Sequence, residues 1–204
     1  MKKYRAKDEL MPSKKKIFID CGSNVGDTIE LFLNNFESSE EYEIFAFEPN
    51  EKLTKNYNYE NTTLINKAVW VKNENKDFLV GIKNQQATNS RLVDFVKGRN
   101  RNKFDEDPIV VSCIDFSTWI KDNLSKEDYI VVKFDIEGSE YDVLRKMIED
   151  DSISYIDEIY IEFHNNHLYR DKVDGEAMAI NISSMGIKIF GNVSGGKEFK
   201  EMFS

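Results

Sequence analysis

Two glycines and one acid near the amino terminus have the spacing of a nucleotide-type site. Asp20 ends an apolar run, and the turn that follows holds Gly22, Ser23, Asn24 and Gly26 before a helical pattern begins. Such a turn lets the backbone approach a ligand at the carboxyl end of a strand. It lacks the GxGxxG and GxxxxGK[ST] spacings that hold phosphates. We therefore expect a cationic, phosphate-free ligand, and S-adenosylmethionine has that chemistry.

A second acid lies where a ribose would be recognised. Glu48 ends the next apolar run and is followed by Pro49, which cannot continue a strand. An acid at this distance along the chain commonly accepts hydrogen bonds from ribose hydroxyls. The alternative is a structural glycine turn with a solvated Glu48.

A third group of residues has the chemistry of a metal site. Asp135 ends one apolar run, and Glu162 and His164 end the next, two positions apart and so on one side of a strand. These ligands suit a divalent cation such as Mg²⁺ or Mn²⁺, which would acidify an acceptor hydroxyl while Glu137 takes its proton. The alternative is a metal-free enzyme in which Glu137 or His164 is the general base.

The elements that must hold these side chains alternate between strand and helix. Short apolar runs are separated by segments in which apolar residues recur every three or four positions. This order is typical of an α/β protein with a mostly parallel sheet. The expected strands are 17–20, 42–47, 62–65, 109–113, 129–134 and 156–163, and the expected helices are 26–36, 50–57, one capped by Asp115, one opened by a Ser139–Asp142 capping box, and 173–185.

Two regions depart from this alternation. Residues 68–71 and 77–82 are expected to form a small inserted antiparallel hairpin, and residues 187–190 and 199–203 a closing hairpin at the edge of the sheet. Residues 83–107 are polar and without a period, as is typical of functional loops. We expect this loop to hold the acceptor through Asn89, Ser90 and Arg91.

The charge is distributed unevenly along the chain. Residues 1–16 carry a net charge of +5 and residues 17–204 a net charge of −14. We expect a basic tail over 1–16 and one domain over 17–204, with an acidic body that disfavours nucleic acid as a partner. No apolar run approaches the length of a membrane span, and no apolar segment follows the basic head as in a secretory signal. These features predict a cytoplasmic protein and leave its oligomeric state open.

Five segments, taken in order, resemble the motifs of FkbM-type methyltransferases. They are residues 18–26 (FIDCGSNVG), 46–50 (AFEPN), 66–69 (NKAV), 112–115 (SCID) and 133–140 (KFDIEGSE). The resemblance implies a Rossmann-like class I methyltransferase fold, with a mostly parallel seven-stranded sheet and an antiparallel C-terminal edge. It also implies methyl transfer from S-adenosylmethionine to a hydroxyl oxygen, often of a sugar in a glycan.

The resemblance completes the set of expected site residues and leaves other acceptors open. A carbohydrate is the expected partner, and the alternatives are RNA ribose, a small phenol or a binding module without turnover. Asp135, Glu137 and His164 are the expected catalytic residues, and the expected cofactor-binding residues are Asp20, Gly22, Ser23, Asn24, Gly26, Asp27, Thr28, Glu48, Asn66 and Asp135.

Overall fold

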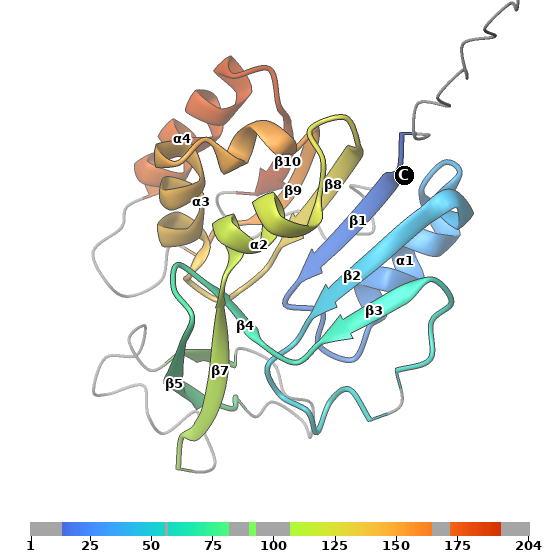
Figure 1. Cartoon of the computed structure of the whole chain (residues 1–204). Coiled ribbons are helices and arrows are strands. Elements are labelled where there is room, and N and C mark those ends of the chain that lie inside the picture. Colours follow the sequence, from blue (N-terminus) through green and yellow to red (C-terminus); the bar gives the residue numbers. More distant parts are fainter. Residues whose placement is uncertain (1–13, 56, 82–89, 93–106, 165–171, 193–204) are drawn as a thin grey trace, which may run out of the picture.

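A parallel sheet forms the centre of the computed structural model, which describes residues 14–55, 57–81, 90–92, 107–164 and 172–192 (Figure 1). Its described strands follow the order β10-β9-β8-β1-β2-β3, and each neighbouring pair is parallel. This confirms the Rossmann-like α/β class. The strands are β1 (Lys16–Cys21), β2 (Tyr42–Phe47), β3 (Thr62–Ile65), β8 (Tyr129–Phe134), β9 (Glu158–Glu162) and β10 (Lys188–Asn192).

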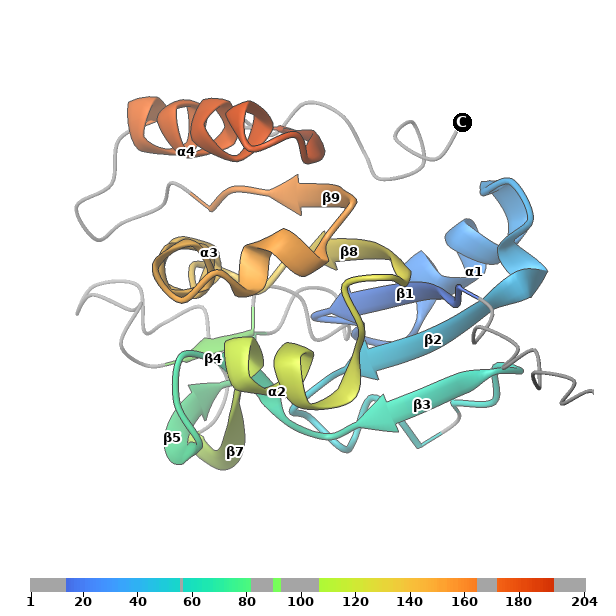
Figure 2. The same ribbon diagram turned by 45° about the horizontal axis from the view of Figure 1, so that its top comes forward.

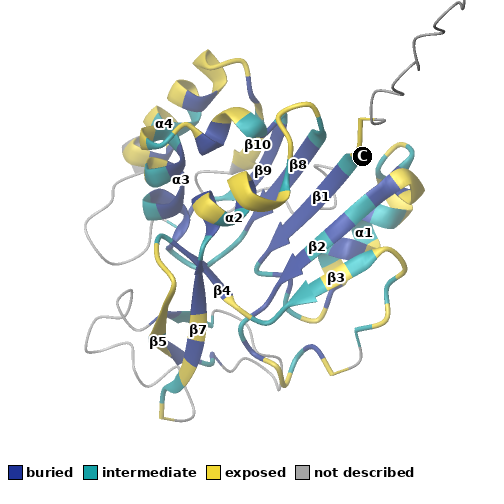
Figure 3. Cartoon of the chain, in the orientation of Figure 1, coloured by how far each residue is buried: buried dark blue, intermediate teal, exposed yellow. Residues whose placement is uncertain are grey.

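Helices cover both faces of this sheet, because alternate residues of its strands point in opposite directions. On one face Phe18 and Val131 pack against Ile29 and Phe32 of α1. On the other face the apolar residues of α2 and α3 pack on the sheet, and α4 joins the same core. The central strands are therefore buried on both sides (Figures 2 and 3). The helices are α1 (Asp27–Asn35), α2 (Phe116–Asn123), α3 (Glu140–Glu149) and α4 (Lys172–Ser184), with short 3-10 turns η1 (Ser39–Glu41) and η4 (Ser152–Tyr155).

A second, smaller sheet lies beyond the carboxyl ends of β1, β2 and β3 (Figure 1). Its order is β4-β7-β5-β6, so the predicted hairpin between 68–71 and 77–82 is wrong. Strand β7 lies between these segments, parallel to β4 and antiparallel to β5, and buries Val111 and Cys113 against apolar residues on both sides. Residues 68–82 carry no sequence signal that they pair with a strand as distant as β7. The strands are β4 (Ala68–Trp70), β5 (Glu74–Leu79), β6 (Arg91–Leu92) and β7 (Ile109–Asp115).

One further local prediction is wrong, and another is tested only in part. Residues 51–55 form turns and not a helix, because the Asn50 side chain accepts from Lys52 N and the Thr54 hydroxyl donates to Glu51 O. Such side-chain bonds compete with helical ones. At the edge of the main sheet, β10 pairs in parallel with β9, since the intervening α4 makes the connection a crossover. The other half of the expected closing hairpin, residues 199–203, lies outside the described residues.

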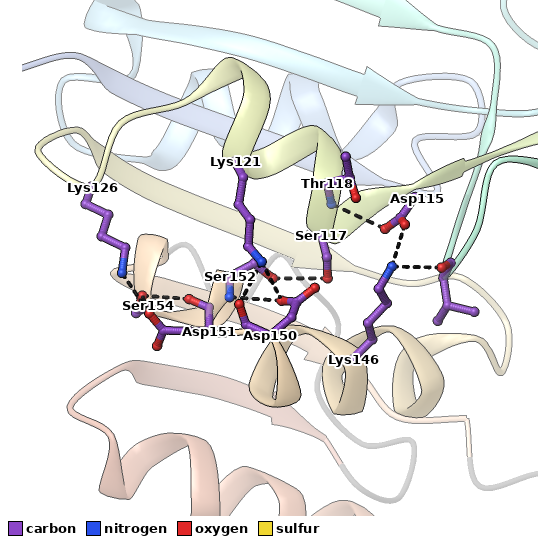
Figure 4. Close-up of polar contacts among 11 residues, drawn as sticks. Asp115, Ser117, Thr118, Lys121, Lys126, Lys146, Asp150, Asp151, Ser152 and Ser154 are labelled. Carbon is purple, nitrogen blue, oxygen red and sulfur yellow. Dashed lines mark hydrogen bonds and ion pairs between the residues drawn. The ribbon is translucent and has the colours of Figure 1, made fainter.

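Polar contacts join the helices on the α2 face to one another and to the small sheet (Figure 4). Asp115 caps α2 as predicted, accepting from Thr118 N at 3.3 Å. Lys146 of α3 pairs with Asp115 and donates to Val71 O at 2.9 Å. The Ser152 hydroxyl of η4 donates to the Ser117 hydroxyl at 3.0 Å. Within the ranges given above, no helix is both long and apolar enough to cross a bilayer.

Candidate active site

A cavity of about 360 Å³ opens at the carboxyl ends of β1, β2 and β8, and the small sheet forms its far wall. Many of the predicted site residues line it together, although their positions span more than half of the chain. They are Gly22, Ser23, Asn24, Asp27, Thr28, Glu48, Ser90, Asp135 and Glu137. The wall from the small sheet is more apolar and consists of Ala68, Val69, Phe78 and Leu92.

The glycine turn is shaped by a close approach of two backbone segments. Gly22 has a φ of +84°, and a Cβ at this position would lie 2.0 Å from the carbonyl oxygen of Asp135. Its amide and that of Ser23 both donate to Phe47 O at 3.0 Å. A side chain at position 22 is therefore excluded both by its φ and by space. Gly26 does not line the cavity, but its φ of +99° similarly favours glycine at the start of α1.

Asp20 lies beneath the cavity and not in its wall. It is fully buried, and its Oδ1 forms an ion pair with Lys133 Nζ at 3.0 Å. Lys133 also donates to Gly22 O at 2.9 Å and lies 3.5 Å from Asp135 Oδ2. Burial raises the pKa of Asp20, although the charge of Lys133 opposes this shift. Burial lowers the pKa of Lys133, but Asp20 and Asp135 outweigh it and leave the pKa raised.

The sequence interpretation missed Lys133. It lies inside an apolar strand, where its pairing with β1 brings it opposite Asp20. A lone lysine in an otherwise apolar run was the available signal, because a buried lysine needs an anionic partner. Lys133 therefore joins the glycine turn to the strand end that carries Asp135.

Glu48 lines the cavity and holds the glycine turn in place. Its two oxygens accept from the backbone amides of Asn24 at 3.0 Å and Asn50 at 2.8 Å. Burial raises the pKa of Glu48 to about 7, although these amide bonds oppose the shift. Asn66 lies behind it, and its side-chain amide donates to Glu48 O at 3.1 Å. Asn66 thus supports Glu48 without lining the cavity.

The cavity also contains a polar atom that a cofactor could use. The hydroxyl of Ser23 is buried, lines the cavity and has no hydrogen-bond partner among the described residues. A buried polar atom without a partner is costly, and a bound ligand group would satisfy it. Together with the acids Glu48 and Asp135, this lining fits a cofactor with hydroxyl and cationic groups, as S-adenosylmethionine has.

Beside the cavity, three predicted ligands converge from β8 and β9. Ligand atoms of Asp135, Glu162 and His164 all lie within 4.8 Å of one another, and we call these residues the acid–imidazole site. His164 Nε2 is 3.8 Å from Asp135 Oδ1 and 3.7 Å from Glu162 Oε1. Burial, followed by the charge of Asp135, raises the pKa of Glu162. The arrangement can hold a divalent cation or, without one, a protonated imidazole.

Glu137 faces the same site from the turn after β8. Its Oε2 is 3.5 Å from His164 Nε2 and 2.7 Å from Arg91 Nη2. Burial raises the pKa of Glu137 to about 7, although His164 and Arg91 oppose the shift. Of the residues expected to hold the acceptor, Arg91 thus contacts Glu137, Ser90 lines the cavity and accepts from Gly81 N, and Asn89 lies outside the described residues.

His164 is held from behind by an acid that the sequence interpretation assigned no role. Its Nδ1 lies 2.9 Å from Oε1 of Glu140, which is fully buried. Burial lowers the pKa of His164, but the Glu140 hydrogen bond and the surrounding acids outweigh it and raise the pKa to about 9. The predicted Ser139–Asp142 capping box is wrong, because Ser139 makes no side-chain cap bond. The acid at position 140, between Ser139 and Asp142, was the sequence signal for this contact.

Comparison with known proteins gives one match, to a family model. No curated protein and no solved structure matched the chain. Residues 20–189, which include every described part of the site, match the family model described as the methyltransferase FkbM domain. The match also covers the glycine turn, Glu48 and the acid–imidazole site. The chain therefore belongs to the FkbM methyltransferase domain family.

Proposed function

We propose that the protein transfers a methyl group from S-adenosylmethionine to a carbohydrate hydroxyl, assisted by a divalent cation. One observation carries this proposal: a single cavity is lined both by the glycine turn and Glu48 and by Asp135 and Glu137. A cofactor held by the first group would present its reactive end to the second. Reactive groups held in this way gain much of their rate from orientation.

Four side chains in and beside the cavity have a role in this proposal. Glu48 would accept hydrogen bonds from the ribose hydroxyls, and the Ser23 hydroxyl would gain the partner that it lacks. Lys133 would keep the glycine turn and Asp135 in register through Gly22 O. S-adenosylmethionine would supply an electrophilic methyl group, with a C–S bond broken and a C–O bond formed. Glu137 would receive the hydroxyl proton, for which its pKa of about 7 is well matched.

The acid–imidazole site fits a metal. Two carboxylates and one imidazole are a donor set that Mn²⁺ accepts, whereas Mg²⁺ would be held by the two carboxylates alone. Metal-bound histidines commonly donate their other ring N–H to a carboxylate, as His164 can to Glu140. The cation would lower the pKa of an acceptor hydroxyl. In the metal-free alternative, the imidazolium of His164 balances the same acids and Glu137 alone is the base.

The surroundings favour a neutral, polar acceptor. The net charge of −14 over residues 17–204 repels RNA, and Ser90 offers a polar contact in the cavity wall.

The buried free thiols of Cys21 and Cys113 are compatible with a reducing, cytoplasmic setting.

Labelled methyl transfer against a panel of glycans, nucleosides and phenols tests the proposal. We expect transfer to a sugar hydroxyl, and treatment with EDTA should remove it until Mg²⁺ or Mn²⁺ is restored. Transfer that persists at full rate after EDTA treatment, with metal analysis showing an empty protein, would leave the metal-free mechanism. Transfer to a phenol alone would contradict the carbohydrate assignment.

Replacing Glu48 with glutamine is expected to weaken S-adenosylmethionine binding. A charged acceptor contributes about 1.5–3 kcal/mol per hydrogen bond, so the dissociation constant should rise about tenfold or more. Calorimetry measures the change, and Glu51→Gln, an exposed acid three positions later, is the matched control. An unchanged affinity would remove Glu48 from the cofactor site.

The same substitution should alter the pH dependence of binding. Because burial raises the pKa of Glu48 to about 7, the wild-type affinity should fall as the pH drops through this value and the carboxylate is protonated. Glu48→Gln should remove that inflection. The folding stability of the cofactor-free protein should change in the opposite direction. An acid with a raised folded-state pKa contributes stability that is lost as the pH rises through about 7.

A further inference from the structure

The carboxylate of Glu140 makes three contacts behind the acid–imidazole site. Glu140 is the first residue of α3 and is fully buried. Its Oε1 accepts from Ile136 N at 2.9 Å, and its Oε2 accepts from Gly138 N at 2.9 Å. Oε1 also lies 2.9 Å from Nδ1 of His164. One side chain therefore joins the turn after β8 to the residue that follows β9.

The contact with His164 determines which ring nitrogen faces the acids. A carboxylate oxygen only accepts hydrogen bonds, so Nδ1 must carry the hydrogen in this pair. In the neutral ring, the lone pair is then on Nε2. This nitrogen is the one that lies 3.5–3.8 Å from the carboxylates of Asp135, Glu137 and Glu162. Glu140 thus directs the reactive nitrogen of His164 toward the site.

The contacts with the two amides fix the backbone around Glu137. Glu137 has a φ of +55°, in the left-handed region that L-residues other than glycine rarely adopt. The amides of its neighbours, Ile136 and Gly138, are the two that donate to Glu140. Since each is held by a separate carboxylate oxygen, the turn keeps Glu137 directed at His164 Nε2.

We propose that Glu140 is a positioning residue that sets the ring orientation of His164 and the turn bearing Glu137 at once. The inference rests on the proposed function for its catalytic meaning, but its geometric content can be measured without methyl transfer. Glutamine cannot reproduce the role of Glu140. It has one acceptor and one donor at these two positions, so whichever position its oxygen takes, its NH₂ group faces the backbone N–H of Gly138 or of Ile136 and that amide loses its acceptor.

The first test uses protein that is unchanged at positions 140 and 164. The chain has two histidines, so ¹⁵N-labelled histidine in a His167→Gln background reports on His164 alone. Above the imidazole pKa, the ¹⁵N shifts should show the proton on Nδ1 and none on Nε2. A neutral ring with its proton on Nε2 would overturn the proposal, and this measurement needs no variant at position 140.

Glu140→Gln provides the second test, with Asp142→Asn as a matched loss of charge in the first turn of the same helix. We expect Glu140→Gln to weaken Mn²⁺ binding by about 10- to 100-fold, with unchanged S-adenosylmethionine affinity, because a neutral amide replaces the carboxylate partner of His164 Nδ1. Asp142→Asn should leave both measurements unchanged. A Glu140→Gln protein with the wild-type Mn²⁺ affinity would overturn the proposal.

The two failures can be distinguished. If wild-type protein binds no Mn²⁺ but carries the proton on Nδ1, the metal in the proposed function is wrong and the role of Glu140 stands. If wild-type protein binds Mn²⁺ but its metal-free form carries the proton on Nε2, the metal in the proposed function stands and the role of Glu140 is wrong.

Discussion

Replacing Asp135 with alanine is expected to abolish methyl transfer while the fold persists. Asp135 lines the cofactor cavity and is also one of the three residues whose ligand atoms converge beside it. A cation at a reacting oxygen supplies several kcal/mol of charge stabilisation, so the rate should fall by about 10³ or more. The measurements are the rate of labelled methyl transfer and the Mn²⁺ affinity, and both should be lost. The circular dichroism spectrum should remain close to wild type, and calorimetry should show that most of the S-adenosylmethionine affinity persists.

Two variants give this result its meaning. Asp122→Ala removes an exposed acid on α2 and should leave activity intact. Glu137→Gln should retain Mn²⁺ binding and slow transfer by about 10² or more, as expected for loss of a general base. If Asp135→Ala keeps wild-type turnover, the acid–imidazole site takes no part in the reaction.

Replacing Lys133 with methionine should have the largest effect on stability. The side chains of Lys133 and Asp20 are 1% and 0% exposed, so the substitution leaves Asp20 buried without its counter-charge. Removing one partner of such a pair costs about 3–5 kcal/mol of folding free energy. Urea unfolding measures the loss. Lys126→Met, which removes an exposed partner of Asp151, should leave the unfolding midpoint nearly unchanged.

A double substitution tests the cause. Asp20→Asn combined with Lys133→Met removes both charges and should recover part of the lost stability, because no ion is then left buried opposite position 133. A double variant as unstable as the sum of the two single variants would show that the pair does not interact. Loss of the Gly22 carbonyl contact should persist in the double variant as weaker cofactor binding.

The sequence predicted the main sheet well because its signals are local. Each strand end that carries an acid, at Asp20, Glu48 and Asp135, is marked by an apolar run beside it, and parallel strands bring such ends to one edge. The small sheet was mispredicted because β7 pairs with segments about forty residues away, and nothing within 68–82 signals that partner.

Lys133 and Glu140 were missed in the sequence for a different reason. Lys133 and Glu140 are charged side chains inside buried segments, and their partners come from other strands and turns. Composition alone predicts such residues at the surface. Only the register between β1 and β8, and the return of the chain to His164, bring their partners within reach.

The small sheet has a consequence for how the wall of the cavity can be changed. All of its strands come from one continuous stretch, between β3 and α2, and they form one wall of the cavity. The glycine turn precedes that stretch in the sequence, and the acid–imidazole site follows it. A protein engineer could therefore exchange the stretch as one unit, provided that Val71 O and Asp115 still meet Lys146 and that residue 91 still pairs with Glu137. On the proposed function, such an exchange would alter the wall of the cavity while the glycine turn and the acid–imidazole site are kept.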